Sequence, residues 1–519
     1  MITNAHSTAA HPIQFWHQNA IQTLSPYSGG RSVLNYLRLD CGLKGTKEGC
    51  AEGDCGACCV LTASLTEQGL VFESINACIH PVAHLHGKAL LSIEDLGTIA
   101  HPHPVQAAMV CAHASQCGFC TPGFVVSLAA CAENARVRRT ASQADSAVTA
   151  PSHSTPSQAT SLTREHLLDA ISGNLCRCTG YKPIIEAGLL AAQSLHGLDH
   201  ATIAAGIAQL SQAATINPQS PRTLPEAHTV LTPRSIHELN AAIAAHPQAV
   251  LVAGCSDVGL WLNKQLRTIP VMISTVQVLE LQGLRHTPAG LEQAGLDLGA
   301  ALTFTQLSAP LLAIYPELHE WYERFASVPV RNAATLGGNV VGGSPIGDSM
   351  PVLLALDAQL LLQKGEVQRT VALKDFYLGY QQKDLHAGEF LRRILIPTRS
   401  KGLKLAVYKI SKRFEDDISA VCAALAFDVK EGTITTARLG FGGVAATPVR
   451  AYSVEAALQG QPFTQAALES AAQLLETAFE PLSDHRASAH YRRLMCGNAL
   501  RRAAAQWFSN EMTRVYENV

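Results

Sequence analysis

The sequence lacks an excess of charge of either sign. Its 39 Lys and Arg side chains nearly balance its 41 Asp and Glu side chains, which gives a formal net charge of −2. A chain with this balance offers no basic face for nucleic acid or for anionic lipid. It also lacks an apolar run approaching the ~18 residues that a membrane-spanning helix needs. We therefore expect neither a nucleic-acid partner nor a membrane partner.

The first residues, Met-Ile-Thr-Asn-Ala-His, lack the cationic and apolar segments of a secretory signal, so we predict no export by the general secretory route. Residues 139–162 lack aromatic side chains and consist almost wholly of Ala, Ser, Thr, Pro and Gln. Such a segment buries too little apolar surface to offset an ordering cost of about 1 to 2 kcal/mol per residue. We predict a disordered surface insertion there.

Cysteine, by contrast, is abundant, and four of the 15 cysteines have the spacing of a plant-type [2Fe-2S] cluster. The run C-A-E-G-D-C-G-A-C is followed by nineteen residues and a fourth cysteine. The predicted ligands are Cys50, Cys55, Cys58 and Cys78. Gly49, Gly53 and Gly56 permit a tight loop whose N–H groups can approach the sulfurs. A structural zinc site or a disulfide knot is the alternative.

A second set follows as C-x2-C and C-x-C. Its predicted ligands are Cys117, Cys120, Cys176 and Cys178. One C-x2-C pair alone would also fit a redox dithiol or half of a zinc knuckle. Two complete sets of four within the first two hundred residues favour two clusters and electron transfer. We interpret the other seven cysteines as small apolar core residues, with Cys255 as the possible exception. Clusters and reduced thiols favour the cytoplasm.

Local patterns predict a multidomain α+β protein. Short strands around one helix at Ser32–Arg38 suit a small β-grasp ferredoxin domain. From Pro104 the pattern becomes helical, with Pro104 at a helix start and Thr163 as an N-cap, which suits a helical bundle for the second cluster. From Pro225 helices and strands alternate, and a long C-terminal helix follows an α+β tail. His101 and His103 could suggest a metal, but a solvated helix start is the favoured interpretation.

A glycine-rich stretch runs from Thr335 to Asp348 as T-L-G-G-N-V-V-G-G-S-P-I-G-D. Its glycines, hydroxyls and amide would let a pyrophosphate approach the backbone closely. The stretch matches neither the P-loop nor the G-x-G-x-x-G pattern, so a turn-rich structural segment is an equal alternative.

With these motifs in hand, the chain resembles the iron-sulfur and flavin portion of the molybdenum hydroxylase family, and within it the separate small subunit of bacterial xanthine dehydrogenases. The resemblance covers nearly the whole chain from about Ile13. It rests on K-E-G-C-A-E-G-D-C-G-A-C, S-Q-C-G-F-C-T-P-G-F, S-G-N-L-C-R-C-T-G-Y, A-T-L-G-G-N with S-P-I-G-D, Y-K-I-S-K-R-F-E-D-D-I-S-A-V and F-G-G-V-A-A-T-P. The insertion between the second cysteine pairs is longer than the family usually carries.

The resemblance implies a domain division. It gives a [2Fe-2S] ferredoxin-like domain at 1–96, a helical [2Fe-2S] domain at 97–198, a linker at 199–221, a two-part α+β FAD-binding domain at 222–400 and a C-terminal α+β flavoprotein domain at 401–519.

The resemblance also implies an FAD site in two loops. The first comprises Leu251, Val252, Ala253, Gly254, Cys255, Ser256, Asp257 and Val258, and Cys255 stands where family members often carry Asn. The second comprises Thr335, Gly337, Gly338, Asn339 and Asp348. Phe325 matches an aromatic residue that stacks on the flavin, although core packing explains it as well from the sequence alone. Leu391 and Lys409 match residues near the ring.

By the same resemblance, electrons from purine oxidation at a molybdopterin centre pass through the helical-domain cluster, the plant-type cluster and FAD to NAD⁺. The molybdopterin would lie on a large partner subunit in an (αβ)2 heterotetramer, touched here by Gln116 and Cys178. No catalytic residue for hydroxylation is expected in this chain. Arg413 and the acidic residues after it would lie near NAD⁺, or form an ordinary solvated loop. The alternative functions are the same electron-transfer role for an aldehyde or N-heteroarene hydroxylase, the delivery of electrons to O2, and the role of a stand-alone electron carrier.

Overall fold

The computed structural model describes residues 11–24, 30–148, 162–210, 229–287, 295–414 and 416–509. These residues form two compact units. The first contains residues up to Val278 together with Ser327–Ala334, and the second contains Leu279–Ala326 and the residues from Thr335 onward. The multidomain α+β architecture that the sequence predicts is confirmed. Among the described helices, none combines the length and apolar character that crossing a membrane requires.

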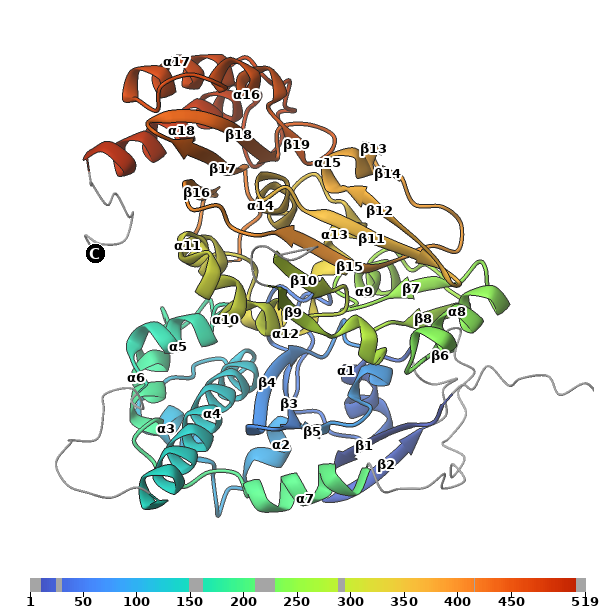
Figure 1. Ribbon diagram of the computed structural model, residues 1–519. Helices are drawn as coiled ribbons and strands as arrows, with labels where there is room; N and C mark the ends of the chain where they lie inside the picture. The colour runs from blue at the N-terminus through green and yellow to red at the C-terminus, as the bar shows by residue number, and fades with distance from the viewer. Residues whose placement is uncertain are drawn as a thin grey trace, which may run out of the picture. The chain divides into compact units, whose positions relative to one another are not determined.

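A five-stranded mixed sheet opens the first unit, in the order β2-β1-β5-β3-β4 (Figure 1). β1 pairs antiparallel with β2 and parallel with β5, as in a β-grasp sheet. The strands are β1 (Ile13–His17), β2 (Ala20–Leu24), β3 (Cys59–Thr66), β4 (Gly69–Asn76) and β5 (Ala89–Leu91). The helical segments of this part are α1 (Val33–Asn35), a π-helical turn at Tyr36–Asp40, a 3-10 turn at Val82–Leu85 and α2 (Ile93–Leu96).

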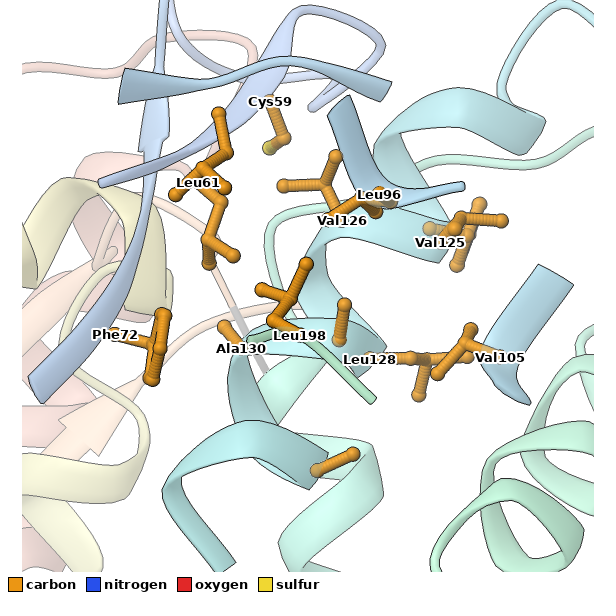
Figure 2. Close-up of a cluster of buried hydrophobic side chains, with 14 of the residues drawn as sticks. Cys59, Leu61, Phe72, Leu96, Val105, Val125, Val126, Leu128, Ala130 and Leu198 are labelled. Carbon is orange, nitrogen blue, oxygen red and sulfur yellow. The ribbon is translucent and has the colours of Figure 1, made fainter. Parts of the chain in front are cut away.

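A helical bundle follows, in which α4 packs against β3 and β4. The helices are α3 (Pro104–Cys111), α4 (Thr121–Val148), α5 (Arg164–Ala170), α6 (Lys182–Ala191) and α7 (His200–Leu210). Pro104 stands in the first turn of α3, and the Thr163 hydroxyl accepts the His166 N–H, so both predicted helix starts are confirmed. Figure 2 shows the shared core, in which Leu61 and Phe72 of the strands lie with Val126 and Leu128 of α4. Burial of these large side chains joins the bundle to the sheet.

In two stretches the secondary structure differs from what the sequence predicts. α4 continues to Val148, so the first part of the predicted insertion is helical, and residues 149–161 lie outside the described part. The predicted linker begins with α7, whose Ile203, Ile207 and Leu210 recur at helical spacing and are buried in the same core. An added Cβ at Gly206 would come within 2.2 Å of the Trp16 ring, so α7 lies flat on the first sheet. The remaining linker residues, 211–221, lie outside the described part.

A buried carboxylate ties three helical elements together. Glu133 of α4 lies 2.8 Å from the Nε2 of His103 and 2.6 Å from the Nε2 of His200. Arg136 donates to the same carboxylate over 2.6 Å, and the backbone N–H of Leu198 lies 3.4 Å from it. His103 also caps α3, so the predicted helix start is correct. Its side chain is buried, however, so the prediction that this helix start is solvated was wrong for His103. The imidazole and the buried carboxylate satisfy one another.

The first unit ends in a parallel sheet of order β6-β8-β7. Its strands are β6 (Thr229–Leu231), β7 (Val250–Val252) and β8 (Val271–Ser274), and its helices are α8 (Ile236–Ala245) and α9 (Val258–Asn263). α12 (Val328–Ala333) comes from later in the chain and packs on β4.

The second unit contains a five-stranded sheet of order β12-β11-β15-β10-β9 and a small hairpin, β13-β14. The strands are β9 (Leu284–Thr287), β10 (Gly295–Gly299), β11 (Gln359–Lys364), β12 (Val367–Ala372), β13 (Tyr377–Gly379), β14 (Gln382–Lys383) and β15 (Phe390–Pro397). The helices are α10 (Phe304–Ile314), α11 (His319–Glu323), α13 (Leu336–Gly342), α14 (Ser349–Ala355) and α15 (Leu373–Phe376), with 3-10 turns at Leu279–Leu281 and Pro316–Leu318.

The C-terminal part is an antiparallel sheet of order β16-β17-β18-β19 covered by helices. Its strands are β16 (Leu403–Ile410), β17 (Val421–Lys430), β18 (Thr433–Gly442) and β19 (Val449–Arg450), and its helices are α16 (Tyr452–Leu458), α17 (Gln465–Leu475) and α18 (Ala489–Ser509). Phe427 and Phe441 of the sheet are buried with Leu500 of α18, which explains why these helices cover it.

Candidate functional site

The first cysteine quartet presents its sulfurs as two pairs. The thiols of Cys50 and Cys55 are in hydrogen-bonding contact, and so are those of Cys58 and Cys78. A [2Fe-2S] cluster needs four thiolates divided between two irons, so this two-plus-two arrangement fits it. Within the described residues, no three His, Cys, Asp or Glu side chains converge closely enough to hold a single metal ion.

Backbone N–H groups surround one sulfur of this quartet. The Sγ of Cys50 lies 3.3 Å from the N–H nitrogen of Cys55 and 3.5 Å from that of Glu52. The contact with the Cys55 thiol lowers the pKa of Cys50 to about 5. A Cβ at Gly49 would lie 2.8 Å from the Cys55 Sγ, so the loop has no room for a side chain there. Such donors stabilise a cluster's negative charge and raise its reduction potential.

The second quartet has the same organisation on helix ends. Cys117, before α4, contacts the Cys178 thiol, and Cys120 contacts the Cys176 thiol. The Cys176 Sγ lies 3.4 Å from the N–H nitrogens of Cys178 and Thr179. Cys117 and Cys178 are exposed whereas Cys176 is buried, so one pair of ligands lies at the protein surface.

Gln116 and Cys178, the two residues predicted to touch a pterin, lie together. The Gln116 side-chain amide donates to the backbone carbonyl of Cys178 over 3.0 Å, and both residues are exposed. The structure thus places them beside the surface-facing pair of the second quartet.

The two quartets meet through their backbones. The Leu175 N–H, one residue before Cys176, donates to the carbonyl of Cys55 over 3.0 Å. The Asn174 amide donates to the Gly56 carbonyl over 3.1 Å. A Cβ added at Gly123 of α4 would lie 2.1 Å from the same carbonyl oxygen. A ligand of one quartet is therefore linked to a ligand of the other by one hydrogen bond and a short run of covalent bonds.

The first predicted FAD loop adjoins the other side of the first quartet. Leu251 and Val252 end β7, residues 253–257 form the turn, and Val258 begins α9. The Asn263 amide of α9 donates to the carbonyl of Cys78 over 2.8 Å and to that of Ala51 over 3.2 Å. α9 thus binds directly to the backbone of a predicted cluster ligand.

Close backbone approach explains the glycine of this loop. A Cβ at Gly254 would lie 2.1 Å from the carbonyl oxygen of Ala333, so no other residue fits without movement. Cys255 is buried with a φ of 61°, a left-handed conformation that Asn adopts more readily than most residues. Burial raises the pKa of Asp257, the one carboxyl in the loop.

The second predicted FAD loop begins at the N-terminus of α13. The Thr335 hydroxyl accepts the Gly338 N–H over 3.0 Å and caps the helix. A Cβ at Gly337 would lie 2.4 Å from the Ala300 carbonyl oxygen, which shows a second close backbone approach. The Asn339 amide oxygen accepts the Ser349 hydroxyl over 2.5 Å.

Asp348 and Lys409 form a buried ion pair. The Lys409 ammonium lies 2.6 Å from Oδ2 of Asp348 and 3.2 Å from the Ser419 hydroxyl. Oδ1 of Asp348 is buried and has no hydrogen-bond partner among the described residues. An unsatisfied buried carboxylate oxygen is costly, and a hydroxyl-bearing ligand such as FAD would satisfy it.

Phe325 lies in an aromatic cluster. Its ring centroid is 4.3 Å from that of Phe304 and 5.3 Å from that of Trp321. Core packing therefore explains its burial, and flavin stacking stays a proposal. Leu391 is buried on β15.

The segment at Arg413 folds back on one carboxylate. Asp417 accepts the backbone N–H groups of Lys412 and Arg413 over 3.1 Å each, and the Arg413 guanidinium lies 3.2 Å from it. Arg413 is exposed, as a solvated loop requires, and a contact with NAD⁺ stays a proposal.

Comparison with known proteins identifies these regions. A [2Fe-2S] binding domain matches residues 92–189, an FAD binding domain in molybdopterin dehydrogenase matches residues 226–399, and a CO dehydrogenase flavoprotein C-terminal domain matches residues 406–507. The chain carries the iron-sulfur and FAD electron-transfer domains of molybdenum hydroxylases.

Relatives in the molybdenum hydroxylase family are larger proteins. Xanthine dehydrogenase/oxidase of Mus musculus is 31% identical over 81% of this chain and 33% of its own length. Xanthine dehydrogenase of Drosophila subobscura is 31% identical over 86% of this chain and 35% of its own length. The chain thus spans about a third of the curated relatives that it matches.

A solved structure of the family resembles about half of the chain. It is carbon monoxide dehydrogenase from Hydrogenophaga pseudoflava in the form that lacks the Mo-pyranopterin moiety of the molybdenum cofactor. The TM-score is 0.50 at 27% identity, over 54% of this chain and 96% of that chain.

Sequence reasoning missed the residues that join the sites. Asn174 donates to the carbonyl of Gly56 and Asn263 to that of Cys78, and Arg331 of α12 pairs with Asp169 over 2.5 Å. In a sequence these are ordinary polar residues. The only sequence signal near them is their position within ten residues of a predicted ligand or loop.

Proposed function

We propose that this chain is the electron-transfer subunit of a xanthine dehydrogenase. Electrons from the oxidation of hypoxanthine or xanthine at a partner's molybdopterin would pass through two [2Fe-2S] clusters to FAD and then to NAD⁺. The division into domains at 1–96, 97–198, 222–400 and 401–519 is part of the proposal.

The observation that carries the proposal is the order of the candidate sites within the first unit. The second quartet has an exposed ligand pair and a backbone hydrogen bond, Leu175 to Cys55, toward the first quartet. The first quartet in turn is bonded through Cys78 to Asn263, on the helix that follows the first FAD loop. This order supports a path from the surface, through both quartets, toward the flavin loop.

Within this proposal, the flavin would be held by the two predicted loops. Gly254 and Gly337 let these loops pack closely on the backbones of Ala333 and Ala300, and Asp348 offers an unsatisfied acceptor. When bound, FAD exchanges two electrons with nicotinamide and single electrons with the clusters. Lys409 contacts the Asp348 carboxylate at the end of the second loop, and the two side chains form a buried pair.

The partner would be a large molybdopterin-binding subunit, in an (αβ)2 heterotetramer. The exposed Cys178 and the adjacent Gln116 are the residues that we assign to that contact. The cytoplasm is the compartment in which we expect the complex.

Cofactor analysis is the first test. The isolated chain should contain four irons, four labile sulfides and one FAD, because each quartet needs one [2Fe-2S] unit. Zinc in place of iron, or two irons after anaerobic reconstitution, would contradict the cluster assignment. Replacing Cys55 should remove one cluster's paramagnetic signal and leave the other.

Separated half-reactions are the second test. The chain alone should oxidise NADH with an artificial dye and should show no purine-dependent reduction of NAD⁺. Purification from native extract should yield the large partner, and the complex should restore purine oxidation. A complex that oxidises aldehydes, N-heteroarenes or carbon monoxide, and not purines, would show that the proposed substrate is wrong. If no partner is found, the stand-alone electron carrier becomes the favoured function.

A further inference from the structure

Lys383 is a half-buried lysine without a partner in the described structure. It ends β14 and pairs across the hairpin with Tyr377 of β13. Its ammonium forms neither an ion pair nor a hydrogen bond with any described residue. Burial lowers the pKa of Lys383, with no neighbouring charge to offset that loss. An uncompensated buried cation is unfavourable, and bound anionic ligands commonly supply the missing charge.

The lysine lies against the glycine-rich loop. A Cβ added at Gly343, the residue after α13, would come within 3.1 Å of the Cε of Lys383 and 3.0 Å of the Tyr377 ring. The Tyr377 hydroxyl donates to the Val340 carbonyl over 2.8 Å, which fixes the hairpin to α13. Gly343 has a φ of 63°, so a residue with a side chain would be strained there as well as crowded. The Lys383 stem therefore reaches the loop because residue 343 is glycine.

Nearby carboxylates are engaged elsewhere. Asp384, the next residue, lies 2.8 Å from the Arg369 guanidinium. Glu389 pairs with the same guanidinium over 2.8 Å. The loop itself ends in Asp348, whose charge is balanced by Lys409 and whose second oxygen has no partner among the described residues. The glycine-rich loop therefore has one cation without a counter-charge beside it, Lys383, and one acceptor without a donor, Oδ1 of Asp348.

We propose that Lys383 binds a phosphate group of a dinucleotide held at the glycine-rich loop. The proposal rests on the proposed function, in which the dinucleotide is FAD or the NAD⁺ that reacts with it. Both carry a pyrophosphate, and a lysine ammonium is a common partner for phosphate oxygens. The unsatisfied oxygen of Asp348 would accept a hydroxyl of the same ligand.

The full chain offers a matched control for this test. Lys364 of β11 also packs its stem against a glycine of positive φ, with Cε 3.4 Å from a Cβ added at Gly388, but it is exposed. We would compare Lys383→Met, Lys383→Arg and Lys364→Met in the full-length, iron-loaded chain. Dissociation constants for FAD and for riboflavin, which lacks phosphate, would be measured by flavin fluorescence on deflavinated protein. The KM for NADH in dye reduction would be measured with saturating FAD.

If Lys383 binds the pyrophosphate of FAD, Lys383→Met should weaken FAD binding roughly 10- to 100-fold, the effect of losing one hydrogen bond to a charged group. Riboflavin binding should not change, Lys383→Arg should retain most of the affinity, and Lys364→Met should behave as the wild type. A KM for NADH raised by a similar factor, with FAD affinity unchanged, would instead assign the phosphate to the nicotinamide dinucleotide.

Two results would overturn the inference in distinguishable ways. A wild-type chain that binds FAD, with a Lys383→Met variant equal to it in both FAD affinity and KM, would refute the role of Lys383 alone. A wild-type chain that binds no FAD would refute the proposed function and this inference together. Equal unfolding midpoints of all variants in urea would show that the changes do not act through misfolding.

Discussion

The contact between the two quartets can be tested by adding one methyl group. Gly123 lies in the first turn of α4, where alanine would be favoured over glycine by about 1 kcal/mol in an isolated helix. In this protein its new Cβ would lie 2.1 Å from the carbonyl oxygen of Gly56. Ordinary Cβ atoms do not approach other atoms within 3.0 Å, so the loop and the helix must separate by roughly 0.9 Å. We expect the overpacking to cost about 1 to 3 kcal/mol, which outweighs the gain in helix propensity.

The separation acts on the backbone link between the clusters. Leu175 donates to the carbonyl of Cys55, the residue before Gly56, so a displaced loop lengthens this hydrogen bond. The magnetic interaction between two reduced clusters falls with the cube of their distance. Gly123→Ala should therefore retain four irons but show weaker splitting of the cluster signals in low-temperature EPR. Reduction of the second cluster by NADH, followed by stopped-flow absorbance, should also be slower.

A matched variant in the same bundle separates this effect from general overpacking. The atoms nearest to an added Cβ at Gly188 of α6 are leucine methyl carbons, those of Leu167 at 2.9 Å and Leu128 at 3.0 Å. Those side-chain ends can move, and they do not lie on either cluster loop. Gly188→Ala should leave the splitting unchanged. Equal splitting in wild type and in Gly123→Ala, with both clusters assembled, would refute the inferred contact.

Three further predictions concern ion pairs in which at least one side chain is buried. Asp348→Asn should lower the free energy of unfolding by about 3 to 5 kcal/mol in urea titrations, because it leaves the buried Lys409 ammonium without its carboxylate. Asp169→Asn should cost about 1.5 to 3 kcal/mol in the same assay, since it removes the carboxylate that Arg331 of α12 contacts. Burial alone would raise the pKa of Glu133, but its hydrogen-bonded histidines hold it at about 2. This carboxylate therefore stabilises the fold above its unfolded pKa, near 4.3, and the contribution is lost as the pH falls toward 2. Glu133→Gln should lack the contribution at every pH, so its stability deficit should shrink in acid; a deficit that grows in acid would contradict this sign.

The cluster ligands could be predicted from the sequence because each quartet depends on short spacings. Three ligands of the first set lie within nine residues, and tight loops bring such thiols together with little help from the rest of the fold. Helix starts at Pro104 and Thr163 were predictable for the same local reason. The contacts between the candidate sites could not be predicted in this way. Gly56 and Gly123 look like a loop glycine and a helix glycine, and no periodicity marks their approach.

Cys255 shows a different limit. Its sequence neighbours predict a loop, and comparison with the family's usual Asn raised a question about its role. The structure shows a left-handed backbone at this buried position, a conformation that Asn adopts more readily than Cys. Nothing in the sequence of one chain reports a φ angle when the residue that adopts it is not glycine or asparagine. The same reasoning applies to α7, since a helix with few large side chains resembles a linker until its partner, Trp16, is known.

The segment Ser327–Ala334 connects the two kinds of candidate site in a way that neither motif indicates. It belongs to the first unit, although the residues before and after it belong to the second. Its Val328 N–H donates to the Ser172 hydroxyl, four residues before Cys176, and its Asn332 amide donates to the Ser74 carbonyl, four residues before Cys78. Thr335 begins the second predicted FAD loop at the next peptide bond after this segment. The second predicted FAD loop therefore follows, along the chain, a segment whose own hydrogen bonds reach the residues just before two predicted cluster ligands.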